Sequence, residues 1–144
     1  MSMQRIMVAT DGSAGADRAI EVAAALAKAV DSELLIVTIS GNFPAEEIRQ
    51  LARAEGGVGE ANELLSNRIL LEAKERAERA GARRIGIWSG WGDPAKGIID
   101  AARRERSDIV VVGRRGRGQL AGLLLGSVSQ EVVSRAPCIV VVVP

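Results

Sequence analysis

The chain has no histidine and a single cysteine, Cys138, among its 144 residues. Without an imidazole, the sequence excludes Ser-His-Asp triads, Cys-His dyads and zinc sites built on histidine. One cysteine also excludes a disulfide framework and a CxxC redox centre. No basic residue adjoins Cys138 in the sequence to lower the pKa of its thiol, so we expect a buried, inert thiol in a reducing compartment.

Aromatic residues and long apolar runs are also scarce. Rings make up 2% of the chain, too few for a platform that stacks single-stranded nucleic acid, and they belong to Phe43, Trp88 and Trp91. We expect both tryptophans to have packing roles. No stretch approaches the roughly 18 apolar residues of a membrane span, and the first residues lack the apolar core of a signal peptide. These absences predict a soluble cytoplasmic protein.

Neither sign of charge dominates. Lys and Arg number 19 and Asp and Glu number 18, which gives a formal net charge of +1. This balance argues against a general binder of nucleic acid or of anionic membranes. The basic run at 103–106 is better explained as a helix C-terminus, where cations complement the dipole. The length and the 47% apolar content predict one globular domain over residues 1–144.

Short apolar runs alternate with segments of helical period. The pattern predicts strands at 5–9, 33–39, 84–89, 108–112 and 139–143, and helices at 14–29, 45–55, 60–80, 94–102 and 127–135. Such alternation is typical of parallel strands joined by helical crossovers, in a doubly wound α/β/α sandwich of three layers. Its ligand crevice lies beyond the carboxyl ends of the strands, where the strand order reverses. We expect the loops after Ala9 and Val112 to meet there.

The glycine-rich segment from Gly113 to Ser127 carries the chemical signal. It leaves a predicted strand and enters a predicted helix, and its glycines let the backbone approach a phosphate or sugar closely. The step from Gly126 to Ser127 places free N–H groups and a hydroxyl at a helix N-terminus, which suits an anion. Positive charge is added by Arg114, Arg115 and Arg117. A purely structural explanation is equally open at this point. Ser127 and Gln130 match a capping box, which needs no ligand, and an arginine-rich loop is often an ordinary solvent-exposed surface.

Two other nucleotide signatures are not supported. Each of the three lysines lacks the preceding glycines and following hydroxyl of a Walker A loop. A GxGxxA match exists at 116–121, but the strand that follows it, at 139–143, ends the sequence without the acidic residue that a dinucleotide fold needs.

The fixed residues Gly113, Gly116, Gly126 and Ser127 fit the pattern G-x2-G-x9-G-[ST]. Together with the opening at 6–13 and the ending at 136–144, this pattern resembles the ATP-binding class of the universal stress protein family over essentially the whole chain. The resemblance implies a Rossmann-like fold of the adenine nucleotide alpha hydrolase type, with a five-stranded parallel sheet in the order 3-2-1-4-5.

The resemblance also implies a set of binding residues for ATP, ADP or AMP, with Mg²⁺ accompanying the phosphates and no other metal site. The adenine would lie near Ala9, Thr10, Asp11 and Ile39. The adenosine would be lined by Val112 and Gly113, with Gly116 along the ribose and phosphates. The phosphates would be held by Gly126, Ser127, Val128 and Ser129. The chain departs from many relatives in having Arg114-Arg115 where they carry Ser-His, which leaves the fine nucleotide preference open.

Asp11 has two explanations from the sequence. It contacts the sugar, the base edge or the magnesium side of a nucleotide, or it is a turn residue that bonds the backbone ahead of the first helix. The resemblance favours the first explanation. The family's last strand often pairs with its copy in a second subunit, so we expect a homodimer through 139–143, an apolar edge that would otherwise be bare.

Three functions remain in competition. The first is a dimeric regulatory protein of the stress response that binds an adenine nucleotide with little or no turnover, because the sequence lacks histidine, a Walker lysine and an obvious general base. The second is a slow ATP-hydrolysing enzyme on the same fold. The third is a dimeric scaffold without a ligand, against which the intact glycine motif argues.

Overall fold

The computed structural model describes residues 3–114 and 125–144. Strands and helices alternate along these residues, with one consecutive pair of helices in the first half. The elements are β1 (Arg5–Ala9), α1 (Ala14–Val30), β2 (Glu33–Ser40), α2 (Ala45–Glu55), α3 (Val58–Arg79), β3 (Ile85–Trp91), α4 (Pro94–Arg104), β4 (Ile109–Gly113), α5 (Ser127–Arg135) and β5 (Ile139–Val143).

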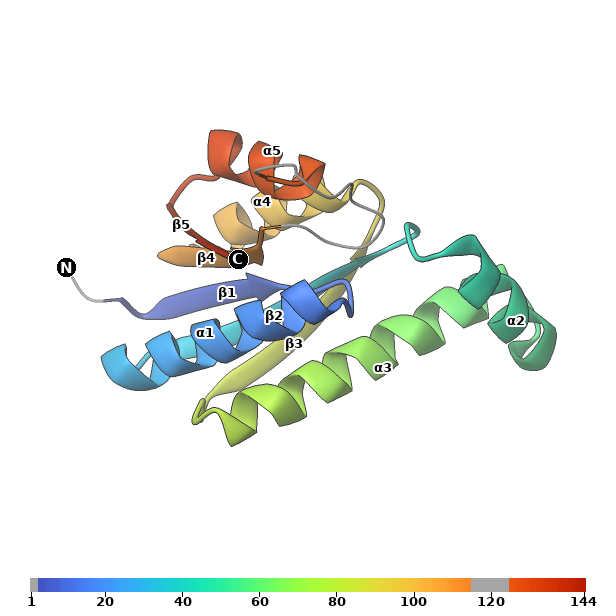
Figure 1. Cartoon of the computed structure of the whole chain (residues 1–144), viewed down its shortest axis with the longest axis horizontal. Coiled ribbons are helices and arrows are strands. Elements are labelled where there is room, and N and C mark those ends of the chain that lie inside the picture. Colours follow the sequence, from blue (N-terminus) through green and yellow to red (C-terminus); the bar gives the residue numbers. More distant parts are fainter. Residues whose placement is uncertain (1–2, 115–124) are drawn as a thin grey trace.

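The five strands form one parallel sheet in the order β3-β2-β1-β4-β5. Helices α1 and α3 cover one face of the sheet, and α4 and α5 cover the other (Figure 1). Strand β1 is central, since Met7 lies opposite Leu35 of β2 on one side and Val110 of β4 on the other. The predicted fold class and strand order are confirmed, and the order reverses between β1 and β4.

The sheet separates two apolar clusters. Alternate residues of β1 point to opposite faces, so that Ile6 and Val8 pack toward α1 and α3 while Met7 packs toward α4 and α5. All three side chains are almost fully buried. Each such side chain contributes roughly 1.5–3 kcal/mol on burial. Burial on both faces explains why the three inner strands, β1, β2 and β4, read as continuous apolar runs in the sequence.

Local signals fix the helix ends. Ser13 caps α1 by accepting a hydrogen bond from the Ala16 amide at 3.2 Å, and Asp93 caps α4 by accepting one from Lys96 at 2.9 Å. Helix α3 ends in a Schellman turn, in which Gly81 has a φ of +105°.

Several element boundaries differ from the sequence prediction by one or two residues, and two of these differences have a clear local cause. Helix α3 begins at Val58 rather than at residue 60, because Gly57 takes the N-cap position. Strand β3 runs on to Trp91 because every residue from Ile85 onward pairs with β2.

The two tryptophans both lie on β3 and pack differently. The guanidinium of Arg104 lies 4.5 Å from the ring centroid of half-buried Trp88, within the range of a cation–π contact. Trp91 is 68% exposed, and its ring lies against the backbone of Gly41. Trp88 therefore has the expected packing role at the sheet edge, whereas most of the Trp91 side chain faces solvent.

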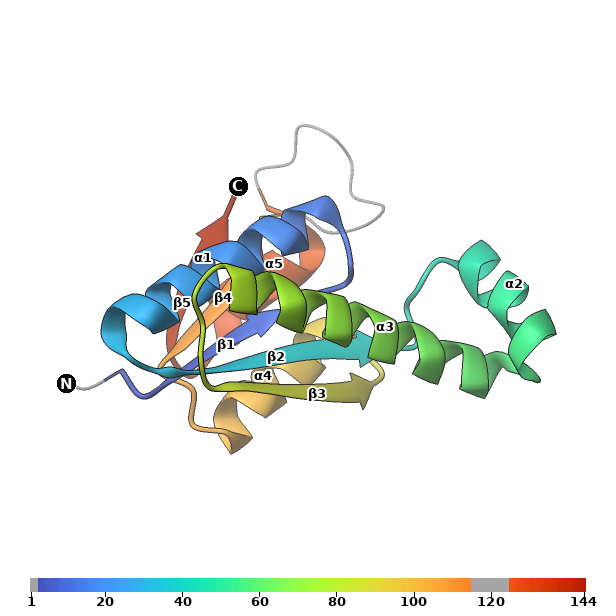
Figure 2. The same cartoon turned by 90° about the horizontal axis from the view of Figure 1, so that it is seen from below.

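Helix α2 contacts α3 and lies away from the sheet and from the other helices. It packs on the first half of α3, beyond the carboxyl ends of β2 and β3 (Figure 2). A small apolar cluster joins the two helices, made by Ile48, Ala61, Leu65 and Ile69 with Phe43 against it. Among the described residues, no helix combines the length and the apolar character needed to cross a membrane.

Candidate functional site

A cleft with a volume of about 240 Å³ lies at the carboxyl edge of the sheet, where the strand order reverses. Its position follows the rule for doubly wound sheets, in which the two central strands send their connections to opposite faces and leave a crevice. Strands β1, β2 and β4 contribute described residues to its lining, and so do the connections and helix starts near their ends. The described lining residues are Ala9, Thr10, Asp11, Ser13, Ala16, Val37, Thr38, Ile39, Asn42, Phe43, Pro94, Ile98, Val112, Gly113, Gly126, Val128 and Ser129.

Nine of the eleven residues named from the sequence lie in this lining. Of the other two, Ser127 is an exposed residue at the start of α5, and Gly116 lies outside the described residues. The remaining lining residues were missed by sequence reasoning. They are Ser13, Ala16, Val37, Thr38, Asn42, Phe43, Pro94 and Ile98.

The turn after β1 is held by its own side chains. The Thr10 amide donates to the Val37 carbonyl at 2.9 Å, which continues the sheet beyond β1. The Thr10 hydroxyl accepts from the Gly12 amide at 3.1 Å, and one Asp11 carboxylate oxygen accepts from the Ser13 amide at 2.9 Å. Asp11 therefore has the turn role considered from the sequence, and it also borders the cleft.

The start of α5 is not a capping box. Gly126 is the N-cap residue and Ser127 is the first residue of the helix, so the hydroxyl of Ser127 is one position too late to cap it. In the described part of the chain, no side chain caps this helix. Its first N–H groups have no acceptor within the helix, and the N-terminus carries partial positive charge. The structural explanation of the Ser127–Gln130 pair is therefore not supported.

The ends of the glycine-rich segment are tied together. The Arg114 amide donates to the Val143 carbonyl of β5 at 2.7 Å. The Arg114 carbonyl oxygen in turn accepts from the Gly126 amide at 2.8 Å and from the Ser129 hydroxyl at 2.7 Å. One residue thus joins the end of β4, the end of β5 and the first turn of α5.

Three helices begin at the cleft. Ser13 and Ala16 line it from α1, Pro94 and Ile98 from α4, and the first turn of α5 completes the set. Because each helix presents its positive end there, the cleft favours a negatively charged group. Side chains cap α1 and α4, which leaves the α5 start as the place where free N–H groups meet the cleft.

The rest of the wall is mostly apolar. Ile39 lies over Gly97 of α4, where a side-chain carbon on Gly97 would come within 2.7 Å of the isoleucine. Phe43 and Val112 extend the apolar lining. A flat, largely apolar group such as a nucleobase suits this wall, and the polar start of α5 suits a phosphate.

The described residues include no group of three or more acidic or cysteine side chains placed to hold a metal ion. Cys138 is half-buried rather than fully buried as expected, and it lies ahead of β5 rather than in the cleft lining described above. Burial and the nearby Asp108 carboxylate raise the pKa of its thiol, so that Cys138 is a poor nucleophile.

Comparison with known proteins agrees with the fold and with the family that the sequence resembles. The model of the universal stress protein family matches residues 3–144. A universal stress protein of Thermus aquaticus is 38% identical over 143 residues, covering 96% of both chains. Universal stress protein Rv1636 of Mycobacterium tuberculosis is 36% identical, covering 96% of this chain and 94% of its own.

Solved structures give the same result. A universal stress protein in complex with cAMP has a TM-score of 0.74 and 32% identity, covering 100% of this chain and 98% of its own. The UspA protein of Lactobacillus plantarum has a TM-score of 0.81 at 21% identity, covering 100% of this chain and 99% of its own, which shows a shared fold. The fold and the cleft thus define a Rossmann-like α/β protein with its crevice at the switch point. The chain belongs to the universal stress protein family.

Proposed function

We propose that this chain, as a single domain over residues 1–144, is a cytoplasmic adenine-nucleotide-binding regulatory protein of the stress response. The observation that carries the proposal is the uncapped start of α5 at the edge of a mostly apolar cleft. A relative of 32% identity has been solved with cAMP, an adenine nucleotide. The chain would act by holding ATP, ADP or AMP, with Mg²⁺ on the phosphates, or by engaging partners in a nucleotide-dependent way.

The residues present fit such a ligand. Gly126 is buried, and its amide already donates a hydrogen bond to the Arg114 carbonyl. The phosphates would therefore bind the N–H groups of Ser127, Val128 and Ser129. The base and sugar would lie along Ala9, Thr10, Asp11, Ile39, Val112 and Gly113, with Gly116 following the sugar and phosphates. We expect turnover well below the ordinary enzyme range of about one per second or more, since the sequence offers no histidine and no Walker lysine.

The proposal is tested by calorimetric titration of nucleotide-free protein with Mg-ATP, ADP, AMP, cAMP and GTP. We expect micromolar binding of an adenine nucleotide, about −8 kcal/mol, and weaker binding of GTP. Gly126→Val fills the buried N-cap position and should abolish binding. Gly59→Val is the matched control, since no atom lies within 4 Å of its added carbon and Gly59 is outside the described cleft lining. If wild-type protein binds no nucleotide, the scaffold function replaces this one.

We further propose a homodimer through β5. This strand pairs with β4 on one side only, and Ile139 at its start is 48% exposed. An apolar edge strand invites pairing with a second copy. Ile139→Lys should convert the dimer to a monomer in sedimentation analysis while leaving the circular dichroism spectrum unchanged. A wild-type protein that sediments as a monomer would contradict the dimer.

A further inference from the structure

Thr38 is a buried residue with an unusual hydroxyl. It lies near the end of β2, is 1% exposed and lines the cleft. Within residues 3–114 and 125–144, two buried side-chain atoms have no hydrogen-bond partner, the Thr38 Oγ1 and the Arg114 Nε. A buried hydroxyl without a partner lowers stability, whereas a methyl in its place would not. The four residues of β2 before Thr38, at 34–37, are all apolar, so valine would serve the fold better.

The neighbouring buried polar side chains are all paired. The Ser40 hydroxyl pairs with that of Ser66 on α3. Asn62 donates to the Val58 carbonyl at 2.9 Å and accepts from the Gly41 amide at 3.3 Å. The Thr38 hydroxyl is thus the unpaired exception beside a satisfied polar group, and it belongs to a residue that lines the cleft.

The position of Thr38 relative to α5 indicates which part of a ligand reaches it. The start of α5 is joined to Arg114, directly after β4, and β1 lies between β4 and β2. Neighbouring strands are about 4.8 Å apart, so Thr38 is about 10 Å across the sheet from the end of β4. A nucleotide whose phosphate meets α5 therefore has its base, the group farthest from the phosphate, over β1 and β2.

We propose that Thr38 is a specificity-determining residue that forms a hydrogen bond to the polar edge of the bound base. This inference rests on the proposed adenine-nucleotide function. A threonine hydroxyl both donates and accepts, and adenine carries an amino donor and ring-nitrogen acceptors, so either partner satisfies it. Without the ligand the hydroxyl is unpaired, so binding relieves an existing cost and favours a polar base over an apolar group of equal size.

The test compares wild type, Thr38→Val and Thr38→Ser by titration with AMP and with adenosine, and by thermal melting without ligand. Thr38→Val keeps the shape of the side chain and removes the hydroxyl. We expect it to melt at the wild-type temperature or higher and to bind AMP and adenosine about tenfold more weakly, by the same factor for both. Thr38→Ser should stay within about threefold of wild type, since it retains the hydroxyl.

Ser66→Ala is the matched control, because its hydroxyl is equally buried but paired, and Ser66 is not among the described lining residues. It should melt at a lower temperature and bind AMP normally. Unchanged binding by Thr38→Val would overturn the inference and leave the proposed function intact. If Thr38→Val weakened the binding of AMP clearly more than that of adenosine, the inference would also be overturned, since the contact would then be with the phosphate. Absence of binding by wild type would overturn both proposals.

Discussion

The Ser129 hydroxyl donates a hydrogen bond of 2.7 Å to the backbone carbonyl oxygen of Arg114, fifteen residues earlier in the chain. Ser129 is buried, and its oxygen also lies 3.1 Å from the Gly126 carbonyl. The bond fixes the first turn of α5 to the end of β4, and with it the position of the N–H groups that face the cleft. The hydroxyl hydrogen is committed to the backbone, so Ser129 would offer a phosphate its amide.

Ser129→Ala should therefore lower the free energy of unfolding by about 1 kcal/mol, because the partly buried Arg114 carbonyl loses one of its two partners. Nucleotide affinity should fall with it, since the α5 start is less firmly placed. Urea unfolding and calorimetric titration measure the two effects. Ser134→Ala is the control on the same helix. The Ser134 hydroxyl is exposed and donates to the Gln130 carbonyl at 3.0 Å, so its loss should change stability by less than about 0.5 kcal/mol.

Gly113 ends β4 against the first turn of α1. A side-chain carbon there would lie 3.1 Å from the Gly15 carbonyl oxygen and 3.2 Å from its carbon, and backbone atoms cannot move aside cheaply. Gly113→Ala should lower the free energy of unfolding by about 1–3 kcal/mol and weaken nucleotide binding.

Gly86→Ala is the control in another strand, since its added carbon would make an ordinary 3.4 Å contact with Leu35. It should be neutral or raise stability by up to about 1 kcal/mol, because glycine weakens a strand. Equal effects of the two substitutions in chemical denaturation would contradict the steric explanation of Gly113.

The sequence predicts the fold well because its local signals agree with one another. Continuous apolar strands, caps such as Asp93 and a C-terminal glycine such as Gly81 each follow from the immediate neighbours in the chain. The α5 start shows the limit of such signals. Ser127 and Gln130 have the spacing of a capping box, but the helix begins at Ser127 itself, and the pattern cannot distinguish these two positions.

The cleft was predicted less completely than the fold. The missed residues reach it from connections or from strand positions that look like ordinary core. Phe43 follows β2 in a loop, and Pro94 is read in the sequence only as a helix start. Thr38 looks like any β-branched strand residue, and its unpaired hydroxyl becomes apparent only when its neighbours in space are known.

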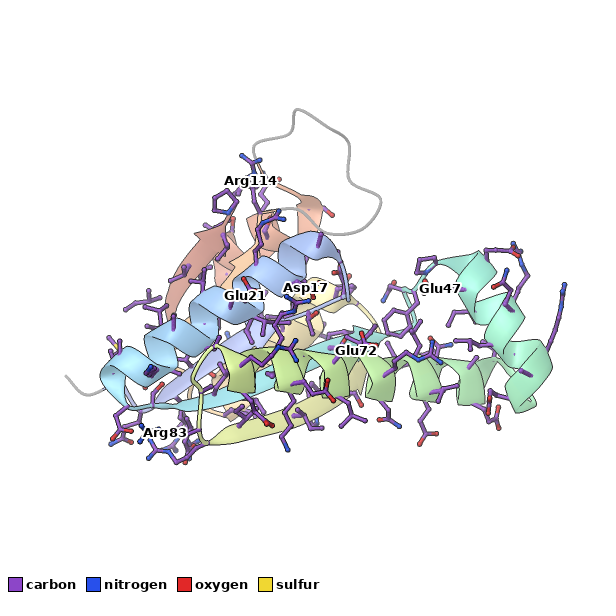
Figure 3. The ribbon with its side chains drawn as sticks, turned by 60° about the horizontal axis from the view of Figure 1, so that its bottom comes forward. Asp17, Glu21, Glu47, Glu72, Arg83 and Arg114 are labelled. Atoms are coloured by element: carbon purple, nitrogen blue, oxygen red, sulfur yellow. The ribbon has the colours of Figure 1, made fainter. Side chains whose placement is uncertain are left out.

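Arg76 connects two helices on one face of the sheet. Its guanidinium lies 2.8 Å from the Glu21 carboxylate and 3.5 Å from that of Asp17, and Figure 3 shows both acids on α1 beside α3. Arg76→Gln leaves the two acids without this cation, so the free energy of unfolding should fall by about 0.5–1 kcal/mol at low salt, as for half-exposed pairs. The difference should shrink in 1 M NaCl, where screening acts over about 3 Å.

The control for Arg76 is Arg49→Gln, which removes an exposed pair with Glu46 within α2. That substitution should change stability by no more than about 0.5 kcal/mol. If the loss caused by Arg76→Gln were the same at both salt concentrations, packing of the arginine stem rather than its charge would be responsible.

Cys138 should react slowly with thiol reagents in the folded protein. Burial is the main cause of its raised pKa, and the Asp108 carboxylate adds to it by disfavouring a second negative charge. The thiolate is the reacting form, so the rate of modification should rise with pH and reach its midpoint at a higher pH than in urea-unfolded protein. The unfolded thiol loses its proton first as pH rises. The thiol therefore makes its full contribution to the free energy of unfolding below the unfolded pKa, and this contribution declines as the pH rises above that value. A folded midpoint at or below the unfolded one would mean that Cys138 is an activated thiol.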